Sequence, residues 1–392
     1  MTFNILSFHK IFEKKYFAAL LFFAFNTFYI LIDLDLFSPF KIGLMCICPF
    51  VLISQKTFIS RTFLFGIFYL ASVTLCAYMH PESFRISTLV YLYMFMFMFL
   101  TFYTLIKQEI WDIEFAINLL KILLVLYIVF FIIQQISLLI GIKRFILFNL
   151  NGEPYLEVFK TNSLSLEPSH SARIMSITFF AWLKLNEYKN GTKETLTTLY
   201  NNHKLFFIGF LYTMLAMGSG TAIIALILLL LYFFKPKTLL IIPIIIFAII
   251  CVNEAVEFAP LNRAIKVIAA IPSMDARTIG QADGSAYYRI APLVSTIKNF
   301  DLTSIPFWFG NGIDSTFHTN GSINLNTVLI GNIANYGLIS FLFLLLFLYT
   351  SVIRKFFSLE TLFFIILMAC TVGNGYYMWG ILMSFMIIKH FE

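Results

Sequence analysis

Long apolar stretches, separated by short polar segments, recur along almost the whole chain. A run of about 17–25 apolar residues is long enough for one helix to cross a membrane. About twelve stretches approach this length, so the pattern predicts an all-α, polytopic bundle of about twelve transmembrane helices. The predicted spans are 16–32, 38–54, 62–79, 87–106, 116–142, 171–186, 205–217, 221–234, 238–253, 323–352, 358–372 and 376–389.

The polar segments between these spans differ in charge, and the difference predicts which way the bundle faces. Lysine and arginine are enriched in the cytoplasmic loops of membrane proteins. Here they gather in every second connection, whereas the alternate connections are acidic, neutral or long. We therefore expect residues 1–392 to form one integral membrane domain with both termini cytoplasmic. The first substantial outer loop would be 143–170, and a large outer loop containing short helices would be 254–322.

The composition agrees with a protein whose solvent is largely lipid. Of the 392 residues, 60% are hydrophobic and 12% are charged, which is about half the charged fraction of a soluble domain. The net charge of +7 would suggest nucleic-acid binding in a soluble protein, but here it follows from the basic cytoplasmic loops. The cysteines lie in or beside apolar runs, which favours packing roles over disulfides or a zinc site. They are Cys46, Cys48, Cys76, Cys251 and Cys370.

The spans themselves carry few charges. They contain almost no acidic residues, which argues against a proton- or sodium-coupled pump. Lys41 and Lys121 fall inside apolar runs but close to a span end. We expect both side chains to extend to the membrane interface, as long basic side chains do at such positions. The polar residues that could support chemistry lie instead in two outward-facing segments, 143–173 and 254–322.

The first outward-facing segment ends in a polar stretch that runs directly into a span. Glu167, Pro168 and Ser169 are typical of a helix start. A helix amino terminus at the membrane surface presents free amides and the positive end of the helix dipole, which suits an anion. His170 and Arg173 share a face of that helix, so together they would form a phosphate site. The alternative is an ordinary helix start in which Arg173 pairs with Glu167 for structure.

The second outward-facing segment begins with a helix signal and continues with arginines. Apolar positions over 260–271 share one side of a helical wheel and polar positions share the other, which predicts a helix lying on the bilayer surface. Arg277 and Arg289 follow this helix. Arginine keeps its charge and presents a planar fork of donors that fits phosphate oxygens, so both are candidates for binding an anion.

A turn with the sequence Gly310-Asn311-Gly312 follows an aromatic cluster near the end of this segment, and His318 comes six residues later beside a span. Histidine is the side chain best suited to general base catalysis near neutral pH. No set of histidine, cysteine and carboxylate residues has the spacing of metal ligands, so we predict no metal and no cofactor. Asp33 and Asp35 form an Asp-x-Asp pair, which we interpret as ordinary acids of an outer loop.

Several of these elements occur in a characteristic order. They are Glu167-Pro168-Ser169 opening a central span, Arg289 in the late loop, Gly310-Asn311-Gly312, His318, and Gly337-Leu338-Ile339 within a span. This order resembles the bacterial O-antigen polymerase and O-antigen ligase superfamily. The stretch from Tyr288 to Ile339 carries the most specific part of the likeness, and the rest is similar in topology and composition. The ligase branch usually has an arginine in the short outer turn before a later span. The corresponding turn, 217–221, has none, which favours polymerase.

The resemblance implies a GT-C-like bundle that acts as a metal-independent, inverting glycosyltransferase. Its substrates would be undecaprenyl-pyrophosphate-linked oligosaccharide repeat units. These would be joined into O-antigen or another surface polysaccharide at the periplasmic face of the bacterial inner membrane. The implied partners are these lipids, the bilayer and a chain-length regulator protein, and not nucleic acid.

Each candidate residue then has an expected role. Arg289 and Arg173 would stabilise the negative charge that develops on the lipid pyrophosphate, and His318 would act as the base for the acceptor hydroxyl. Glu167 is the second candidate for the base. The expected catalytic residues are His318, Arg289 and Arg173, and the expected substrate-binding residues are Glu167, His170, Arg277, Asn320 and Tyr288.

Three other functions compete with this one. An O-antigen ligase would share most of these features. A lipid-linked oligosaccharide flippase or other transporter would need polar residues along a path through the spans. Lys41 and Lys121 do not provide such a path, because both lie near the ends of their spans. A receptor or assembly scaffold would account for long outer loops but not for arginine and histidine near the span ends.

Overall fold

The computed structural model is all-α in the part of the chain that it describes, as the apolar pattern predicts. The 14 α-helices of this part form two compact units. Unit 1 contains α2–α5 and α12–α17, and unit 2 contains α6–α9 and α11. The described residues are 13–28, 38–55, 59–83, 85–142, 160–234, 259–273, 275–284, 287, 290, 294, 297, 298, 300–312, 332–368 and 376–392.

Four helices in the described part are long and apolar enough to cross a membrane, so the expectation of about twelve is wrong for this part of the chain. Three further apolar helices are shorter than a full span. One expected span, 238–253, lies outside the described residues. The four long helices are α4 (Arg61–Met79), α5 (Ile86–Lys107), α6 (Ile113–Leu139) and α15 (Asn332–Val352); the shorter ones are α3 (Pro39–Ser54), α9 (Gly220–Phe233) and α16 (Leu359–Met368).

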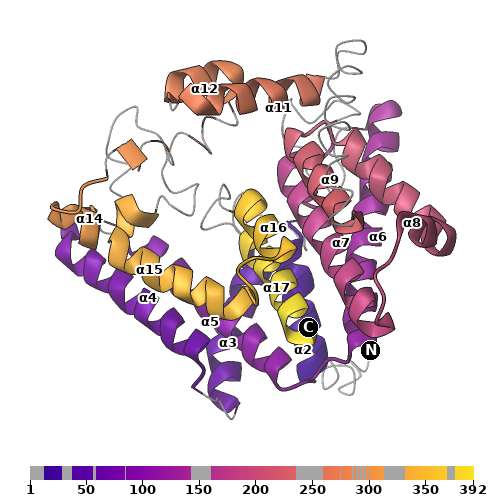
Figure 1. The fold of residues 1–392 in the computed structure, drawn as a ribbon. Helices are drawn as coiled ribbons and strands as arrows, with labels where there is room; N and C mark the ends of the chain where they lie inside the picture. The colour runs from indigo at the N-terminus through magenta and orange to yellow at the C-terminus, as the bar shows by residue number, and fades with distance from the viewer. Residues whose placement is uncertain are drawn as a thin grey trace. The chain divides into compact units, whose positions relative to one another are not determined.

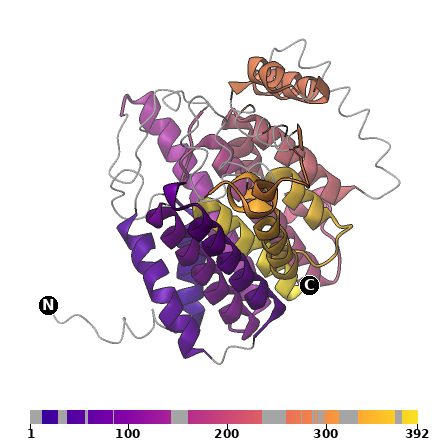
Figure 2. The same cartoon turned by 90° about the vertical axis from the view of Figure 1, so that its left-hand side faces the viewer.

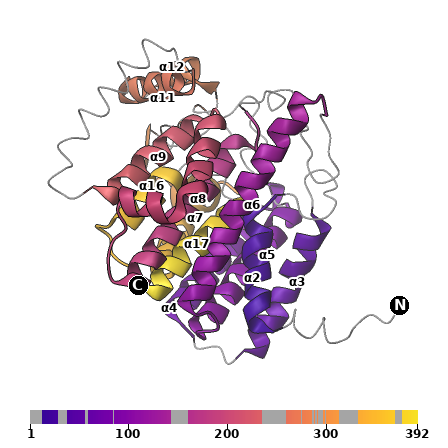
Figure 3. The same ribbon diagram turned by 90° about the vertical axis from the view of Figure 1, so that its right-hand side faces the viewer.

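Unit 2 packs its helices in alternating directions (Figures 1 and 3). The start of α6 is joined to the end of α7 (Pro168–Asn190) by an ion pair in which Lys189 Nζ lies 2.7 Å from Glu114 Oε1. The hydroxyl of Tyr212 in α8 (Leu196–Ala216) donates to Gln135 Oε1 of α6 over 2.8 Å. Near the end of α9, Tyr232 donates its hydroxyl to Glu187 of α7 over 3.1 Å. The four helices therefore alternate in direction along the chain.

The central helix of unit 2 is α7, and it is buried along most of its length. Pro168 fixes the first position of the helix, where a missing amide costs nothing. Gly191 ends it in the left-handed conformation, with φ of 68°. In its middle, the ring of Phe179 stacks on Phe210 of α8 with centroids 4.0 Å apart. Since the helix is enclosed on all sides, its polar residues must find partners inside the protein.

Unit 1 is built around close contacts between α2 (Lys14–Asn26), α17 (Tyr376–Phe391) and α5 (Figures 1 and 2). Gly380 lets α17 approach α2, because a Cβ at this glycine would lie 2.5 Å from the carbonyl oxygen of Phe25. The side-chain amide of Asn26 donates to the Gly380 carbonyl over 3.1 Å. Phe95 of α5 stacks on Trp379, with ring centroids 5.8 Å apart.

A second close approach joins the turn after α14 (Ile305–Phe309) to a kink in α15. Gly337 interrupts α15 with φ of 85° and ψ of 165°. A Cβ at Gly337 would lie 2.2 Å from the Trp308 carbonyl oxygen, and one at Gly310 would lie 2.3 Å from the Asn335 carbonyl oxygen. The Gly312 amide donates to that same Asn335 carbonyl over 3.1 Å. The two backbones are therefore in direct contact, which only glycine permits.

The carboxyl end of α15 is capped by a lysine from another helix. Lys389 of α17 donates its ammonium group to the carbonyls of Tyr349 (3.1 Å), Thr350 (2.6 Å) and Ile353 (2.6 Å). The last carbonyls of a helix have no partner within the helix. An ammonium group has three protons to donate, and its charge suits the negative end of the helix dipole.

Short helices occupy the described part of the long loop 254–322. The helix predicted over 260–271 forms as α11 (Ala259–Ala270), followed by the 3₁₀ turn η4 (Ile271–Ser273), α12 (Ala276–Ala282) and α14. Cys46, Cys48 and Cys76 are free thiols, and Cys251 and Cys370 lie outside the described residues.

Lys41 is enclosed by protein and is not exposed at the surface of the described structure. Its side chain is fully buried in unit 1, with Nζ 4.7 Å from the centre of the Tyr376 ring. The contact between Lys41 and Tyr376 joins α3 to α17, and local sequence does not encode it.

Candidate functional site

A buried polar loop leads into α7 in unit 2. Its first half is fixed by Gln134 of α6, whose side-chain amide donates to Asn162 Oδ1 (3.3 Å) and to the Ser163 carbonyl (2.9 Å). The side-chain oxygen Oε1 of Gln134 accepts the Ser163 backbone amide over 2.7 Å. Ser163 has φ of 52°, a left-handed conformation that costs energy for a residue other than glycine. The bonds from Gln134 on both sides of Ser163 hold the backbone in that conformation.

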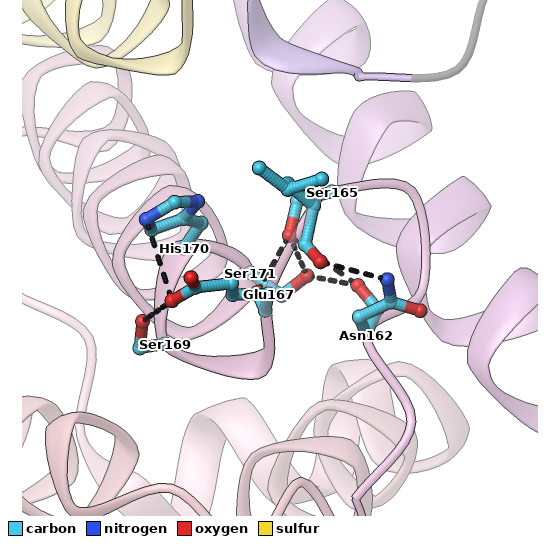
Figure 4. Close-up of polar contacts among 7 residues, drawn as sticks. Asn162, Ser165, Glu167, Ser169, His170 and Ser171 are labelled. Atoms are coloured by element: carbon cyan, nitrogen blue, oxygen red, sulfur yellow. Dashed lines mark hydrogen bonds and ion pairs between the residues drawn. The ribbon is translucent and has the colours of Figure 1, made fainter. Parts of the chain in front are cut away.

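The second half of the loop is tied to the first turn of α7 by hydroxyl groups (Figure 4). Ser165 and Ser171 share a hydrogen bond of 2.6 Å between their hydroxyls. The Ser165 hydroxyl also lies 2.8 Å from the Glu167 carbonyl oxygen, and the Ser171 hydroxyl contacts the Asn162 carbonyl oxygen, so each hydroxyl has a carbonyl as well as the other hydroxyl within hydrogen-bond reach of its single proton. All of these groups except the exposed end of Glu167 are buried. The start of α7 is therefore held rigidly by a network of polar groups inside an apolar unit.

Glu167 lies between the loop and α7, at the partly exposed edge of this network. It is the N-cap residue of α7, yet its carboxylate makes no capping bond to the helix amides. Instead, Oε2 lies 3.7 Å from His170 Nε2 and accepts the Ser169 hydroxyl over 3.2 Å, as Figure 4 shows. The Glu167 side chain is 39% exposed, whereas the His170 side chain is 9% exposed. The pair thus presents a carboxylate to the surface with an imidazole directly beneath it.

Arg173 lies one turn further along α7, on the same face as His170. Only 4% of the residue is exposed. A buried guanidinium is costly unless anionic or polar groups surround it. The first two turns of α7 therefore combine a buried positive charge, an imidazole and a partly exposed carboxylate. Such a set can bind an anion and can move a proton to or from a hydroxyl at the surface.

Replacing Gln134 by leucine is expected to destabilise unit 2 while leaving its apolar core intact. The leucine removes three hydrogen bonds and leaves Asn162 and Ser163 with unsatisfied buried groups. Each such group costs about 1–3 kcal/mol, so the midpoint of thermal unfolding should fall by at least roughly 6 °C. Ser137→Ala is the matched control, because the Ser137 hydroxyl donates only within α6, to Ile133. Equal midpoints for the two variants, measured in detergent, would contradict this prediction.

Of the other predicted site residues, the structure describes only Arg277. Arg277 is exposed on α12, which belongs to unit 1. Beside it, a hydrogen bond from the Thr278 hydroxyl holds the pKa of the Asp275 carboxyl below its ordinary value. The four remaining residues, His318, Arg289, Asn320 and Tyr288, lie outside the described residues. Among the residues that the structure describes, no three metal-ligating side chains gather.

The structure describes residues 310–312, which form the turn that precedes His318. Gly312 lies against the end of α4, where a Cβ on this glycine would be 3.1 Å from the His80 Cβ. His80 Nδ1 lies 3.2 Å from Glu82 Oε1. The amide of Glu82 and the neighbouring His80 hold the pKa of the Glu82 carboxyl below its ordinary value. Gly312 therefore lies beside a second histidine–carboxylate pair, in unit 1.

Sequence reasoning did not select Gln134 or Asn162, which organise the loop before α7. A signal was present for one of them, since Gln134 and Gln135 are adjacent amides within a long apolar run. Polar side chains inside a membrane helix require partners, and such pairs mark contacts with other polar elements. Nothing local distinguishes Asn162, because its partner lies in another helix.

Comparison of the chain with models of protein families, with curated proteins and with solved structures finds no match.

Proposed function

We propose that this chain is a polymerase of the O-antigen type, which joins undecaprenyl-pyrophosphate-linked oligosaccharide repeat units at the periplasmic face of the inner membrane. The observation that carries the proposal is the polar site at the start of α7. There Glu167, His170 and Arg173 lie within two turns of a helix that is otherwise enclosed by apolar neighbours. The candidate spans support membrane residence, and the sequence order of Arg289 and His318 supports the enzyme class.

The proposed reaction is a single displacement that needs no nucleotide sugar. A hydroxyl of the acceptor repeat unit attacks the anomeric carbon of the donor sugar as the bond from that carbon to the pyrophosphate oxygen breaks. The new glycosidic bond inverts the configuration at this carbon. The hydroxyl proton passes to a protein base, and undecaprenyl pyrophosphate leaves as an anion.

The residues divide between the two ends of this reaction. Negative charge grows on the departing pyrophosphate, and arginines placed there lower the barrier because they bind the charge more strongly as it develops. We assign this role to Arg173 and Arg289. We assign the base to His318, with Glu167 as the second candidate. His170 would position Glu167, since its imidazole lies 3.7 Å from the carboxylate.

The decisive test is reconstitution of the purified full chain in lipid with lipid-linked repeat units and no nucleotide sugar. We expect ladders of lipid-linked oligomers longer than the supplied unit. Glu167→Gln should lower the rate about 10-fold if the carboxylate positions or binds substrate, and more than 100-fold if it is the base. Ser169→Ala is the control, because it removes only a hydroxyl that donates to that carboxylate. Transfer of a preformed polymer to lipid A core without chain growth would identify a ligase instead.

A further inference from the structure

A second polar helix start occurs in unit 1, at the amino terminus of α3. Ser38 is the N-cap residue, Pro39 occupies the first helical position and Lys41 the third. Lys41 is fully buried, and only 3% of Ser38 is exposed. The first turn of a helix has amides without acceptors in the helix and carries the positive end of the dipole. Lys41 places a buried ammonium group in the same turn.

The hydroxyl of Ser38 is a second, independent observation that indicates a ligand at this helix start. A serine at the N-cap ordinarily accepts a hydrogen bond from an amide of the first turn, but Ser38 makes no such bond. Within the described part of the chain, its buried hydroxyl has no hydrogen-bond partner. An unsatisfied buried hydroxyl costs about 1–3 kcal/mol. A ligand oxygen at the helix start would remove this cost.

The side chains of this turn face the same end of the helix. Side chains of a helix lean toward its amino terminus, and Lys41 and Ser38 both belong to the first turn of α3. Its Nζ lies 4.7 Å from the centre of the Tyr376 ring at the start of α17. That ring is held in turn by Phe95 and Phe25, with centroids 5.3 and 5.8 Å away. The ammonium group is therefore positioned by a rigid aromatic wall.

We propose that the amino-terminal turn of α3 is a phosphate-binding site formed by Lys41, the Ser38 hydroxyl and the first-turn amides. A phosphate or pyrophosphate group supplies the oxygens that a hydroxyl, amides and an ammonium group can bind together. The group is carried by a lipid headgroup or is free in solution, and the test below separates these sources. The first turns of α3 and α17 lie together, since Lys41 contacts Tyr376.

The site also suggests how the proposed reaction is supplied with substrate. Polymerisation consumes two lipid-linked molecules, and each carries a pyrophosphate. The α3 site would hold the pyrophosphate of one of these two molecules. This assignment rests on the proposed function, but the proposal that α3 binds phosphate is independent of it. Chain growth requires both molecules at once, so a protein of this class needs a second anion site besides the one at α7.

The test is lipid binding by the purified full chain, measured by native mass spectrometry with undecaprenyl phosphate, and by thermal shift with inorganic pyrophosphate. Lys41→Met should weaken binding of undecaprenyl phosphate at least 10-fold and lower the number of lipids bound per chain by one. Lys41→Arg should keep affinity within about threefold, and Ser38→Ala should weaken it about threefold to tenfold. Lys121→Met is the control for loss of one lysine from a span and should bind as the wild type does.

The outcomes separate the possible readings. Wild-type affinity and stoichiometry in Lys41→Met and Ser38→Ala would overturn the site. If Lys41→Met yields no folded protein, Ser38→Ala decides, because it keeps the charge and the contact with Tyr376. A thermal shift by pyrophosphate that depends on Lys41, without lipid binding, would assign the site to a free anion. Lipid binding that depends on Lys41 in a protein that makes no polymer would overturn the proposed function and leave this site intact.

Discussion

Gly337→Ala is expected to prevent stable folding of the contact between α14 and α15. An added Cβ would lie 2.2 Å from the Trp308 carbonyl oxygen and 2.6 Å from the Gly310 amide nitrogen, and both are backbone atoms that cannot rotate away. Gly337 also has φ of 85°, which costs a non-glycine residue about 1–3 kcal/mol. Strain and collision together should exceed about 4 kcal/mol, which is large for one substitution.

Gly43→Ala is the matched control for this variant. Gly43 lies inside α3, and a Cβ there meets no atom within 4 Å. Alanine in a helix interior is favoured over glycine by about 0.5–1 kcal/mol, so this variant should be as stable as the wild type or slightly more so. The measurement is the fraction of monodisperse protein recovered on size exclusion after heating in detergent. Similar recovery of Gly337→Ala and Gly43→Ala would show that the backbone contact does not hold unit 1 together.

Arg173→Met is expected to lower polymer formation by about 1,000-fold. A donor group aimed at developing charge is worth about 10²–10³ in rate even when it is neutral, and Arg173 is charged and buried. Arg173→Lys keeps the charge but loses the planar fork of donors, so it should recover part of the rate, to within about 30-fold of wild type. The readout is the length and amount of lipid-linked oligomer formed from purified substrate at fixed time.

Arg289→Ala and His318→Ala should lose polymer formation to a similar degree, since a general base contributes about 10²–10⁴ in rate. All of these variants should insert in the membrane and elute as folded protein. A folded His318→Ala or Arg289→Ala variant that still makes ladders of normal length would contradict the assignment of catalytic residues. Loss of folded protein in Arg173→Met but not in Arg173→Lys would show that the guanidinium site also supports the structure.

Sequence patterns located the elements of this fold better than they located its contacts. The apolar runs placed α4, α5, α6 and α15, because a membrane span requires length and hydrophobicity and little else. The polar start of α7 was also readable, since Pro168 marks a first helical turn wherever that helix packs. Local signals of this kind depend on neighbouring residues only.

The features that could not be predicted depend on distant residues. Lys41 appears in sequence as a lysine near a span end, and its burial depends on Tyr376 of another helix. The left-handed backbone of Ser163 depends on Gln134, which bonds on both sides of it. The kink at Gly337 depends on the backbone of Trp308. In each case a local rule was overridden by a partner whose identity only the tertiary structure supplies.

The order of the units along the chain has a consequence for how the protein is made. The helices of unit 2 all come from one continuous stretch, Ile113–Ser273, whereas unit 1 combines helices that come before that stretch with helices that come after it. Asn26 bonds to Phe22 within its own helix, but its bond to Gly380 joins residues 354 positions apart. At a synthesis rate of about 5–20 residues per second, roughly 20–70 s separate the synthesis of Asn26 from that of Gly380. Unit 2 can thus assemble during translation, whereas unit 1 closes only after the last helices have been inserted.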